Sequence, residues 1–256
     1  TLRHTYLVHL LGIRHVVVAV NKMDLVDYDQ TRFEAIVRAY RAATTRLELG
    51  QVLAIPLSAL KGDNVTLPGR ATMPWYQGPT LLDHLETVET AQDEGAGAFA
   101  MPVQWVNRPH LDFRGFAGTV VRGSISPGDA VVVAKSGRPA RVERLVTADG
   151  DLQIAAAGAA VTVVLDQEID IARGDVLADP KARPEVSDQL AAHLFWMADE
   201  PMLPGRRYVM KLATQQVPAS ITAIKHKIDV NTQEERPGRS LELNEIAFCN
   251  LHLGQS

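Results

Sequence analysis

The residues with the clearest chemical potential are Asn21-Lys22-Met23-Asp24, which directly follow the β-branched run Val16–Val20. Open α/β sheets bind ligands at the carboxyl ends of parallel strands, where this tetrapeptide would lie. A carboxylate at Asp24 can accept two parallel hydrogen bonds, and guanine offers that pair from its N1–H and its exocyclic amine. Adenine cannot offer it, so a carboxylate at this position would discriminate between the two bases. The alternative is a turn that carries a solvated lysine.

A second short motif, Ser58-Ala59-Leu60, follows the apolar run Val52–Ile55. It lies 37 positions after Asn21, which leaves room for one helix and one strand between the two motifs. Small residues at this point let the backbone approach a planar base closely. By itself Ser-Ala-Leu carries no information, but in register with the first motif it indicates the same site.

The segments around these motifs alternate between strand and helix patterns. From Gln30 to Leu49 apolar residues recur at spacings of three and four, which predicts a helix with Asp29 as its N-cap and Gly50 at its end. A further helix is predicted over residues 80–88, and the runs before the two motifs are typical of buried parallel strands. The pattern indicates a doubly wound α/β sheet of which only two strands are visible.

The chain changes character after residues 91–98, a small and polar stretch typical of a linker. Short β-rich runs separated by Gly and Pro turns follow, and this pattern indicates small barrels. We therefore expect a multidomain α/β plus all-β chain, with an α/β domain over residues 1–92 and β-barrel domains over 98–180 and 186–256, the second barrel incomplete. The strands are expected at 118–121, 130–134, 141–146, 160–165, 175–177, 189–195, 207–213, 220–228 and 246–251.

The composition is typical of a soluble globular protein. Lys and Arg total 26 against 30 Asp and Glu, and the formal net charge is −4. This balance predicts no nucleic-acid partner, and the lack of an apolar stretch of about 18 residues predicts no membrane partner. The single cysteine, Cys249, is expected to be buried and favours a cytoplasmic location. The histidines lack metal-site spacing, so no metal site is expected, and Trp75, Trp105 and Trp196 are expected to be packing anchors.

In this order, Asn21-Lys22-Met23-Asp24 and Ser58-Ala59-Leu60 resemble the guanine-recognition elements of P-loop GTPases. The resemblance implies GTP as the ligand, all seven residues in nucleotide binding, and the Ala59 N–H directed to guanine O6. The 256 residues contain no Gly-x-x-x-x-Gly-Lys-[Ser/Thr] phosphate loop, and Asp112–Gly115 matches the Asp-x-x-Gly switch only in the β-rich part. We expect residues 1–92 to be the C-terminal part of a GTPase α/β domain, with the catalytic residues and the Mg²⁺ ligands upstream of Thr1.

More specific stretches resemble the large, GTPase subunit of bacterial ATP sulfurylase, also called sulfate adenylyltransferase. These stretches are residues 11–28, 102–109, 111–118, 149–152, 168–171 and 195–198. The resemblance implies a GTPase subunit that couples GTP hydrolysis to the formation of adenosine 5′-phosphosulfate and pyrophosphate from ATP and sulfate, in sulfate assimilation. It also implies a small catalytic adenylyltransferase subunit as partner and, in some members, a fused C-terminal adenosine-phosphosulfate kinase domain.

Two other functions stay open on the residues alone. One is an elongation-factor-like GTPase that binds aminoacyl-tRNA, and the other is a non-catalytic barrel scaffold. Arg108, Asp112 and Arg114 are expected in one loop between strands. Two guanidinium groups and a carboxylate suit recognition of charged groups on a partner subunit or on a switch of the G domain. The alternative is an internal Arg–Asp pair that holds the shape of the loop.

Overall fold

The protein is described from a computed structural model, which covers residues 1–89, 96–110, 112–230, 232 and 234–256. Most of the linker predicted at 91–98 therefore lies outside the described residues, as does Leu111. Internal contacts divide the chain into one unit of residues 1–90 with 229–234 and another of 91–228 with 235–256. The three domain boundaries expected from the sequence stay a prediction.

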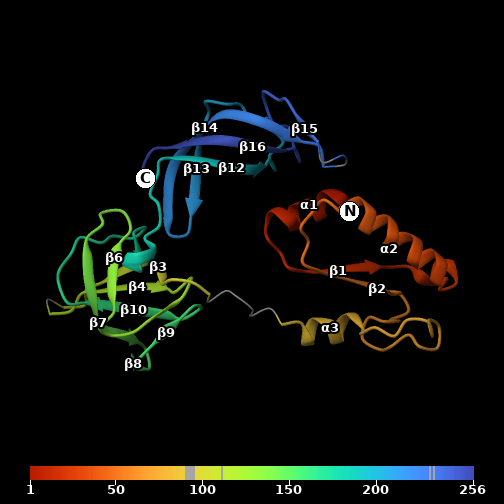
Figure 1. The fold of residues 1–256 in the computed structure, drawn as a ribbon, viewed down its shortest axis with the longest axis horizontal. Coiled ribbons are helices and arrows are strands. Elements are labelled where there is room, and N and C mark those ends of the chain that lie inside the picture. The colour runs from red at the N-terminus through yellow and green to blue at the C-terminus, as the bar shows by residue number, and fades with distance from the viewer. Residues whose placement is uncertain (90–95, 111, 231, 233) are drawn as a thin grey trace. The chain divides into compact units, whose positions relative to one another are not determined.

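The first unit holds the α/β part of the chain (Figure 1). Its two strands pair in parallel, with His15 opposite Gln51 and Val20 opposite Pro56, so the two predicted parallel strands are confirmed. The elements are α1 (Leu2–Leu10), β1 (His15–Val20), the 3₁₀ helix η1 (Met23–Val26), α2 (Gln30–Thr44), β2 (Gln51–Pro56) and α3 (Leu81–Thr87). Helix α1 was not predicted from the sequence.

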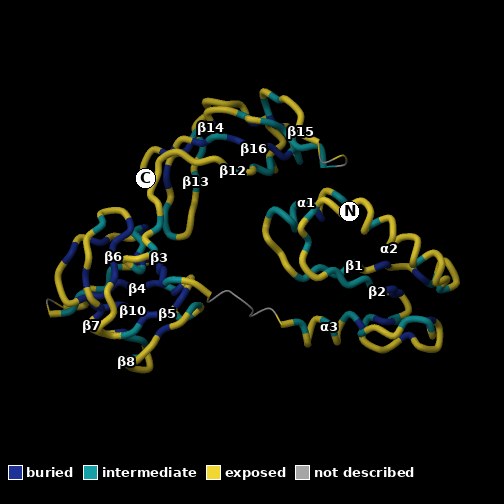
Figure 2. The backbone as a smooth tube through the Cα atoms, viewed as in Figure 1, coloured by how far each residue is buried: buried dark blue, intermediate teal, exposed yellow. Residues whose placement is uncertain are grey.

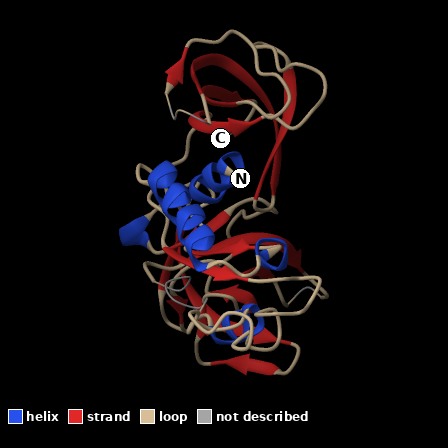
Figure 3. Ribbon diagram, turned by 90° about the vertical axis from the view of Figure 1, so that its right-hand side faces the viewer, coloured by secondary structure: helices blue, strands red, loops and turns tan. Residues whose placement is uncertain are grey.

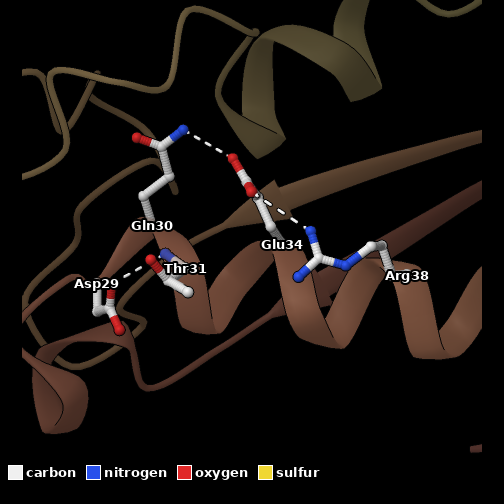
Figure 4. A network of polar contacts seen from close by, with 5 residues as sticks. All are labelled: Asp29, Gln30, Thr31, Glu34 and Arg38. Carbon is white, nitrogen blue, oxygen red and sulfur yellow. Dashed lines mark hydrogen bonds and ion pairs between the residues drawn. The ribbon is translucent and has the colours of Figure 1, made fainter.

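Helix α2 begins where the sequence predicts, because Asp29 caps it. The Asp29 carboxylate accepts a hydrogen bond of 2.8 Å from the Thr31 N–H, as Figure 4 shows. On the exposed side of the first turns, the Gln30 amide donates to Glu34 at 2.8 Å, and Arg38 forms an ion pair with Glu34 at 3.5 Å. Contacts of this spacing add a few tenths of a kcal/mol each to an isolated helix, about 0.2–0.5.

The predicted end of this helix is wrong, because α2 stops at Thr44 and not near Gly50. The hydroxyl groups of Thr44 and Thr45 donate to the carbonyls of Tyr40 and Arg41, both at 2.9 Å. Threonine bonds of this kind compete with the regular helix and weaken it slightly, and both lie at its C-terminal end. A glycine is required at position 50 for a different reason. An added Cβ at Gly50 would collide with the backbone carbonyl of Arg14, at the start of the pairing between β1 and β2.

The second unit begins with a closed β-barrel. In its sheet the strand order is β10-β4-β3-β11-β6-β7-β8, and β10 also pairs with β7, which closes the ring. The strands are β3 (Ala100–Asn107), β4 (Gly115–Thr119), β6 (Ala130–Val133), β7 (Pro139–Thr147), β8 (Gly150–Leu152), β10 (Ala160–Leu165) and β11 (Val176–Ala178), with the pair β5 (Ser124–Ile125) and β9 (Ala155–Ala156) beside them. The barrel predicted for this region is confirmed.

The barrel is filled by alternating apolar side chains. Along β7, Ala140, Val142 and Leu145 are buried and their neighbours are exposed or half-buried. The tube in Figure 2 shows such dark blue positions along the barrel strands. Gly118 is needed at the contact between β3 and β4, because an added Cβ would collide with the Pro102 carbonyl. The prediction that Trp105 is a packing anchor is wrong, because its side chain on β3 is 65% exposed.

A second, five-stranded sheet follows the short 3₁₀ helix η2 (Pro180–Ala182). Its order is β12-β16-β14-β13, with β15 paired to β14, so β12 and β13 lie at its edges. The strands are β12 (Gln189–Phe195), β13 (Arg207–Leu212), β14 (Gln215–Ile228), β15 (Glu235–Arg236) and β16 (Ile246–Leu253). Cys249 is buried in the core of this sheet, as predicted.

Helices and strands, which Figure 3 distinguishes by colour, are unevenly distributed along the chain. The α-helices of the described residues all lie before residue 90, and strands and loops dominate afterwards. Within the same residues, none of the helices combines the length and the apolar character that crossing a membrane requires.

The cap of α2 can be tested by replacing Asp29 with Ala. The variant loses the acceptor for the Thr31 N–H, so the first helical turn should lose about 1 kcal/mol of stability. Asp29→Asn keeps an acceptor oxygen and serves as the matched control. Hydrogen exchange of the amides of the first turn measures the change, and equal protection in the Ala variant and the wild type would contradict the cap.

Candidate functional site

The two sequence motifs lie side by side because their strands are neighbours. Beyond the last paired residues of β1 and β2, the Leu57 N–H donates to the Val20 carbonyl at 3.0 Å. The Met23 N–H then donates to the Leu57 carbonyl at 3.2 Å. The backbone pairing therefore continues past both strand ends, and it carries Asn21–Asp24 and Ser58–Leu60 to the same edge of the sheet.

The side chain of Asn21 links the two loops. Its carbonyl oxygen Oδ1 accepts from the Lys22 N–H at 2.7 Å and from the Ala59 N–H at 3.0 Å. The backbone of Lys22 is left-handed, with φ 66°, which turns the chain sharply after Asn21. The Ala59 N–H, which the family resemblance directs to guanine O6, is thus hydrogen-bonded to Asn21 in this structure.

The carboxylate of Asp24 is oriented by the other loop. The Ser58 hydroxyl donates to Asp24 Oδ1 at 2.7 Å and accepts from the Lys61 N–H at 3.2 Å. Ser58 is fully buried, with 0% exposure, so this hydroxyl has a fixed position. Because a carboxylate has about four lone-pair positions, one bond from Ser58 leaves Asp24 able to accept two parallel donors from a ligand.

The seven predicted residues divide into a supporting set and an accessible set. Met23 is 1% exposed and packs against Val20 and Met73, so its side chain belongs to the core. Leu60 is 83% exposed, and Asn21, Lys22 and Ala59 are also exposed, with Asp24 half-buried. The polar and backbone groups that can bind a ligand are therefore accessible, and the buried side chain of Met23 anchors their loop to the core.

The structure adds Tyr28, Asp63 and Asn64 to this site, which the sequence analysis did not select. Asn64 is 3% exposed, has a left-handed backbone with φ 55°, and donates from Nδ2 to the Pro56 carbonyl at 2.9 Å. Its Oδ1 accepts from the Gly69 N–H at 2.7 Å. The turn signal Gly62-Asp63-Asn64 could have pointed to this anchor, because Asn tolerates a positive φ better than most residues.

The second candidate group, formed by Arg108, Asp112 and Arg114, belongs to the other unit. Arg108 directly follows β3 and forms an ion pair with Glu168 at 3.4 Å. Arg114 directly precedes β4, with its guanidinium carbon 5.6 Å from the centre of the Phe116 ring. Among the described residues, Arg108 thus has its ion-pair partner outside the loop, on Glu168, and the choice between a partner role and an internal Arg–Asp pair stays a prediction.

This loop borders an open, polar cavity of about 300 Å³. Arg114 and Asp112 line one part of it, and Glu143, Asp166 and Glu168 line another. The mixture of one guanidinium group and four carboxylates suits contact with a charged protein surface better than a small apolar ligand.

The chain is similar over nearly its whole length to curated bacterial proteins. It is 53% identical over 253 residues to the bifunctional enzyme CysN/CysC of Xylella fastidiosa, covering 99% of this chain and 40% of that protein. It is 51% identical over 255 residues to sulfate adenylyltransferase subunit 1 of Chromobacterium violaceum, covering 99% of this chain and 53% of that protein. The chain therefore spans about half, or less, of the length of these relatives.

Residues 189–256 match the family described as GTP-eEF1A C-terminal domain-like. Among solved structures, Sup35 complexed with GMPPNP is similar in fold with a TM-score of 0.58, at 22% identity, over 99% of this chain and 64% of that one. The elongation factor SelB of Methanococcus maripaludis is similar with a TM-score of 0.54, at 18% identity, over 99% of this chain and 54% of that one. The chain is thus similar in sequence to sulfate adenylyltransferase subunit 1 proteins, and similar in fold to Sup35 and SelB.

Proposed function

We propose that the chain is the guanine-recognising and barrel-forming part of a sulfate adenylyltransferase GTPase subunit. The observation that carries this proposal is the pair of links between the motifs, Asn21 to Ala59 and Asp24 to Ser58. Two loops tied in this way present one carboxylate at the carboxyl ends of two parallel strands. In the whole protein, GTP hydrolysis drives the formation of adenosine 5′-phosphosulfate and pyrophosphate from ATP and sulfate.

In the proposed complex, Asp24 accepts from the N1–H and the exocyclic amine of guanine while Ser58 keeps its carboxylate in place. Asn21 holds the two loops together, and the methylene stem of Lys22 covers the base. A half-buried acceptor that the base covers discriminates strongly, because adenine would leave the Asp24 carboxylate without its two donors. The base is thereby selected without any contribution from the phosphates.

The proposal includes two partners for the chemistry that these residues do not supply. Mg²⁺ and the groups that hold the GTP phosphates belong to other parts of the protein, and a small catalytic subunit carries out adenylyl transfer. We also propose a cytoplasmic location. As one domain layout we propose a fused adenosine-phosphosulfate kinase, for which the support is that one relative is named a bifunctional enzyme. Identities near 50% over nearly the whole chain support this function over an elongation factor, which is supported by a family match over residues 189–256 and by a likeness in fold.

The role of Asp24 predicts a change of base preference in Asp24→Asn. In the full-length protein this variant should bind GTP more weakly by about 2–4 kcal/mol, because a charged hydrogen-bond pair is lost. Its preference should move toward xanthosine triphosphate, whose extra carbonyl suits the amide donor. Competitive binding of labelled nucleotides measures both effects.

Asp27→Asn is the matched control, because it removes the same charge from a neighbouring exposed residue whose left-handed backbone, with φ 48°, suits Asn. Equal GTP affinity of Asp24→Asn, Asp27→Asn and wild type would refute the assignment of Asp24.

The role of the loop at Arg108, Asp112 and Arg114 predicts a loss of coupling in Arg114→Ala. GTP binding should stay nearly intact, because Arg114 directly precedes β4 of the barrel and belongs to neither of the two guanine-recognition loops. The GTP-dependent stimulation of adenosine phosphosulfate synthesis should fall by about 5-fold or more, which is the lower range of a typical coupling free energy.

Arg144→Ala is the control for this experiment, since Arg144 is another half-exposed arginine of the barrel, paired with Asp151 at 2.8 Å. If stimulation by the Arg114 variant is unchanged and only its thermal stability falls, the loop is structural.

The proposal also predicts that the isolated 256 residues do not turn over GTP. Phosphoryl transfer depends on phosphate positioning and Mg²⁺, and no phosphate-loop motif occurs among these residues. Release of phosphate from GTP by the purified chain, measured with and without Mg²⁺, checks this. Magnesium-dependent turnover that Asp24→Asn abolishes would contradict it.

A further inference from the structure

Tyr28, four residues after Asp24, has a backbone conformation that a bulky residue rarely adopts. Its φ is 55°, and the φ of the preceding Asp27 is 48°, so two consecutive residues other than Gly are left-handed. Such residues cost about 1–3 kcal/mol each and persist only where surrounding contacts hold them, often near functional sites.

Three hydrogen bonds hold Tyr28, and each uses a different group of the residue. Its N–H donates to the Met23 carbonyl at 2.9 Å, and its carbonyl accepts from the Trp75 indole at 3.1 Å. Its phenol donates to the Asp63 carboxylate at 2.7 Å. The bond to Asp63 is the main reason why the pKa of Tyr28 is raised to about 12, so the phenol stays a donor throughout the physiological range.

Asp63 closes the turn that carries Ser58. The Ser58 N–H donates to the Asp63 carbonyl at 3.1 Å, and the Gly62 N–H donates to the Ser58 carbonyl at 2.8 Å. The bond between Tyr28 and Asp63 therefore joins the segment after Asp24 to the segment after Ser58, across 35 positions of sequence. Besides the bonds of Asn21 and Asp24 it is a third side-chain link between the two loops, and it uses neither of those residues.

We propose that the Tyr28–Asp63 pair is a positioning pair that sets the spacing between the two guanine-recognition loops. This inference rests on the proposed function of the site. The links through Asn21 and Asp24 use groups that also face the base in the proposed complex. The Tyr28–Asp63 bond stands apart from those groups and keeps the loops in register while Asp24 accepts from guanine. Neither residue needs to touch the nucleotide.

The test compares Tyr28→Phe, Asp63→Ala and Asp63→Asn in the full-length protein. Tyr28→Phe keeps the ring that packs against Met23 and Met73 and removes only the hydroxyl. Tyr76→Phe is the matched control, because it removes a phenol that donates to the Pro79 carbonyl at 3.0 Å, within the same unit but outside the two loops. The measurements are the thermal midpoint and the affinities for GTP, inosine triphosphate and ATP.

We expect Tyr28→Phe and Asp63→Ala each to weaken GTP binding about ten-fold, and the double variant to be no weaker than either single one. Inosine triphosphate lacks the exocyclic amine, so misplacing Asp24 should also reduce the ratio of GTP to inosine triphosphate affinity. Asp63→Asn keeps an acceptor for the phenol and should retain most of both quantities. Tyr76→Phe should lower only the thermal midpoint.

The inference is overturned if Tyr28→Phe changes the thermal midpoint alone, as Tyr76→Phe does, or if the effects of Tyr28→Phe and Asp63→Ala add. If Tyr28→Phe does not fold, Asp63→Asn against Asp63→Ala decides the same question, and equal losses in both overturn the pairing. A wild-type protein that binds ATP as tightly as GTP would refute the proposed function itself, which separates the two failures.

Discussion

The parallel pairing of β1 with β2 is the contact on which the candidate site depends. The two strands run in register from His15 opposite Gln51 to Val20 opposite Pro56, so they end at the same level. Because parallel strands present their carboxyl ends at one edge, both loops start from adjacent points. An antiparallel pairing of the same strands would place the two motifs at opposite ends of the sheet.

Polar links then convert this proximity into a defined geometry. Buried or half-buried groups such as Ser58 and Asn64 hold the backbone, while the exposed Asn21 and Ala59 remain at the surface. Each link joins residues of different loops or anchors a loop to a strand, and hydrogen bonds inside such networks strengthen one another. The left-handed conformations at Lys22, Tyr28 and Asn64 fit this arrangement, since strained residues persist where several contacts fix them.

The β-rich unit is held together by strand pairing around a closed barrel rather than by a single pair of parallel strands. Its barrel closes through the two partners of β10, so the strands form a rigid frame that does not depend on helices. The loop that contains Arg108 and Arg114 connects two adjacent strands of this frame and borders an open cavity. A rigid frame with a charged loop is a common way to present a contact surface, because the loop side chains vary without disturbing the core.

The sequence by itself determined the elements and the two motifs. Periodicity located β1, β2, the start of α2 and most barrel strands, and residue chemistry pointed to Asp24 and Ser58 as a pair of strand-end groups. These inferences succeeded because they depend on residues that are close in sequence or on the fixed geometry of a parallel sheet.

Tertiary structure alone decided the rest. The bond between Tyr28 and Asp63 joins residues 35 positions apart, and no pattern in either segment predicts it. The early end of α2 at Thr44 and the exposure of Trp105 likewise depend on competing hydrogen bonds and on packing that a one-dimensional pattern does not contain. Side-chain partners are chosen by the free energy of the whole folded arrangement, so a residue type predicts what a group can bind but not which group lies beside it.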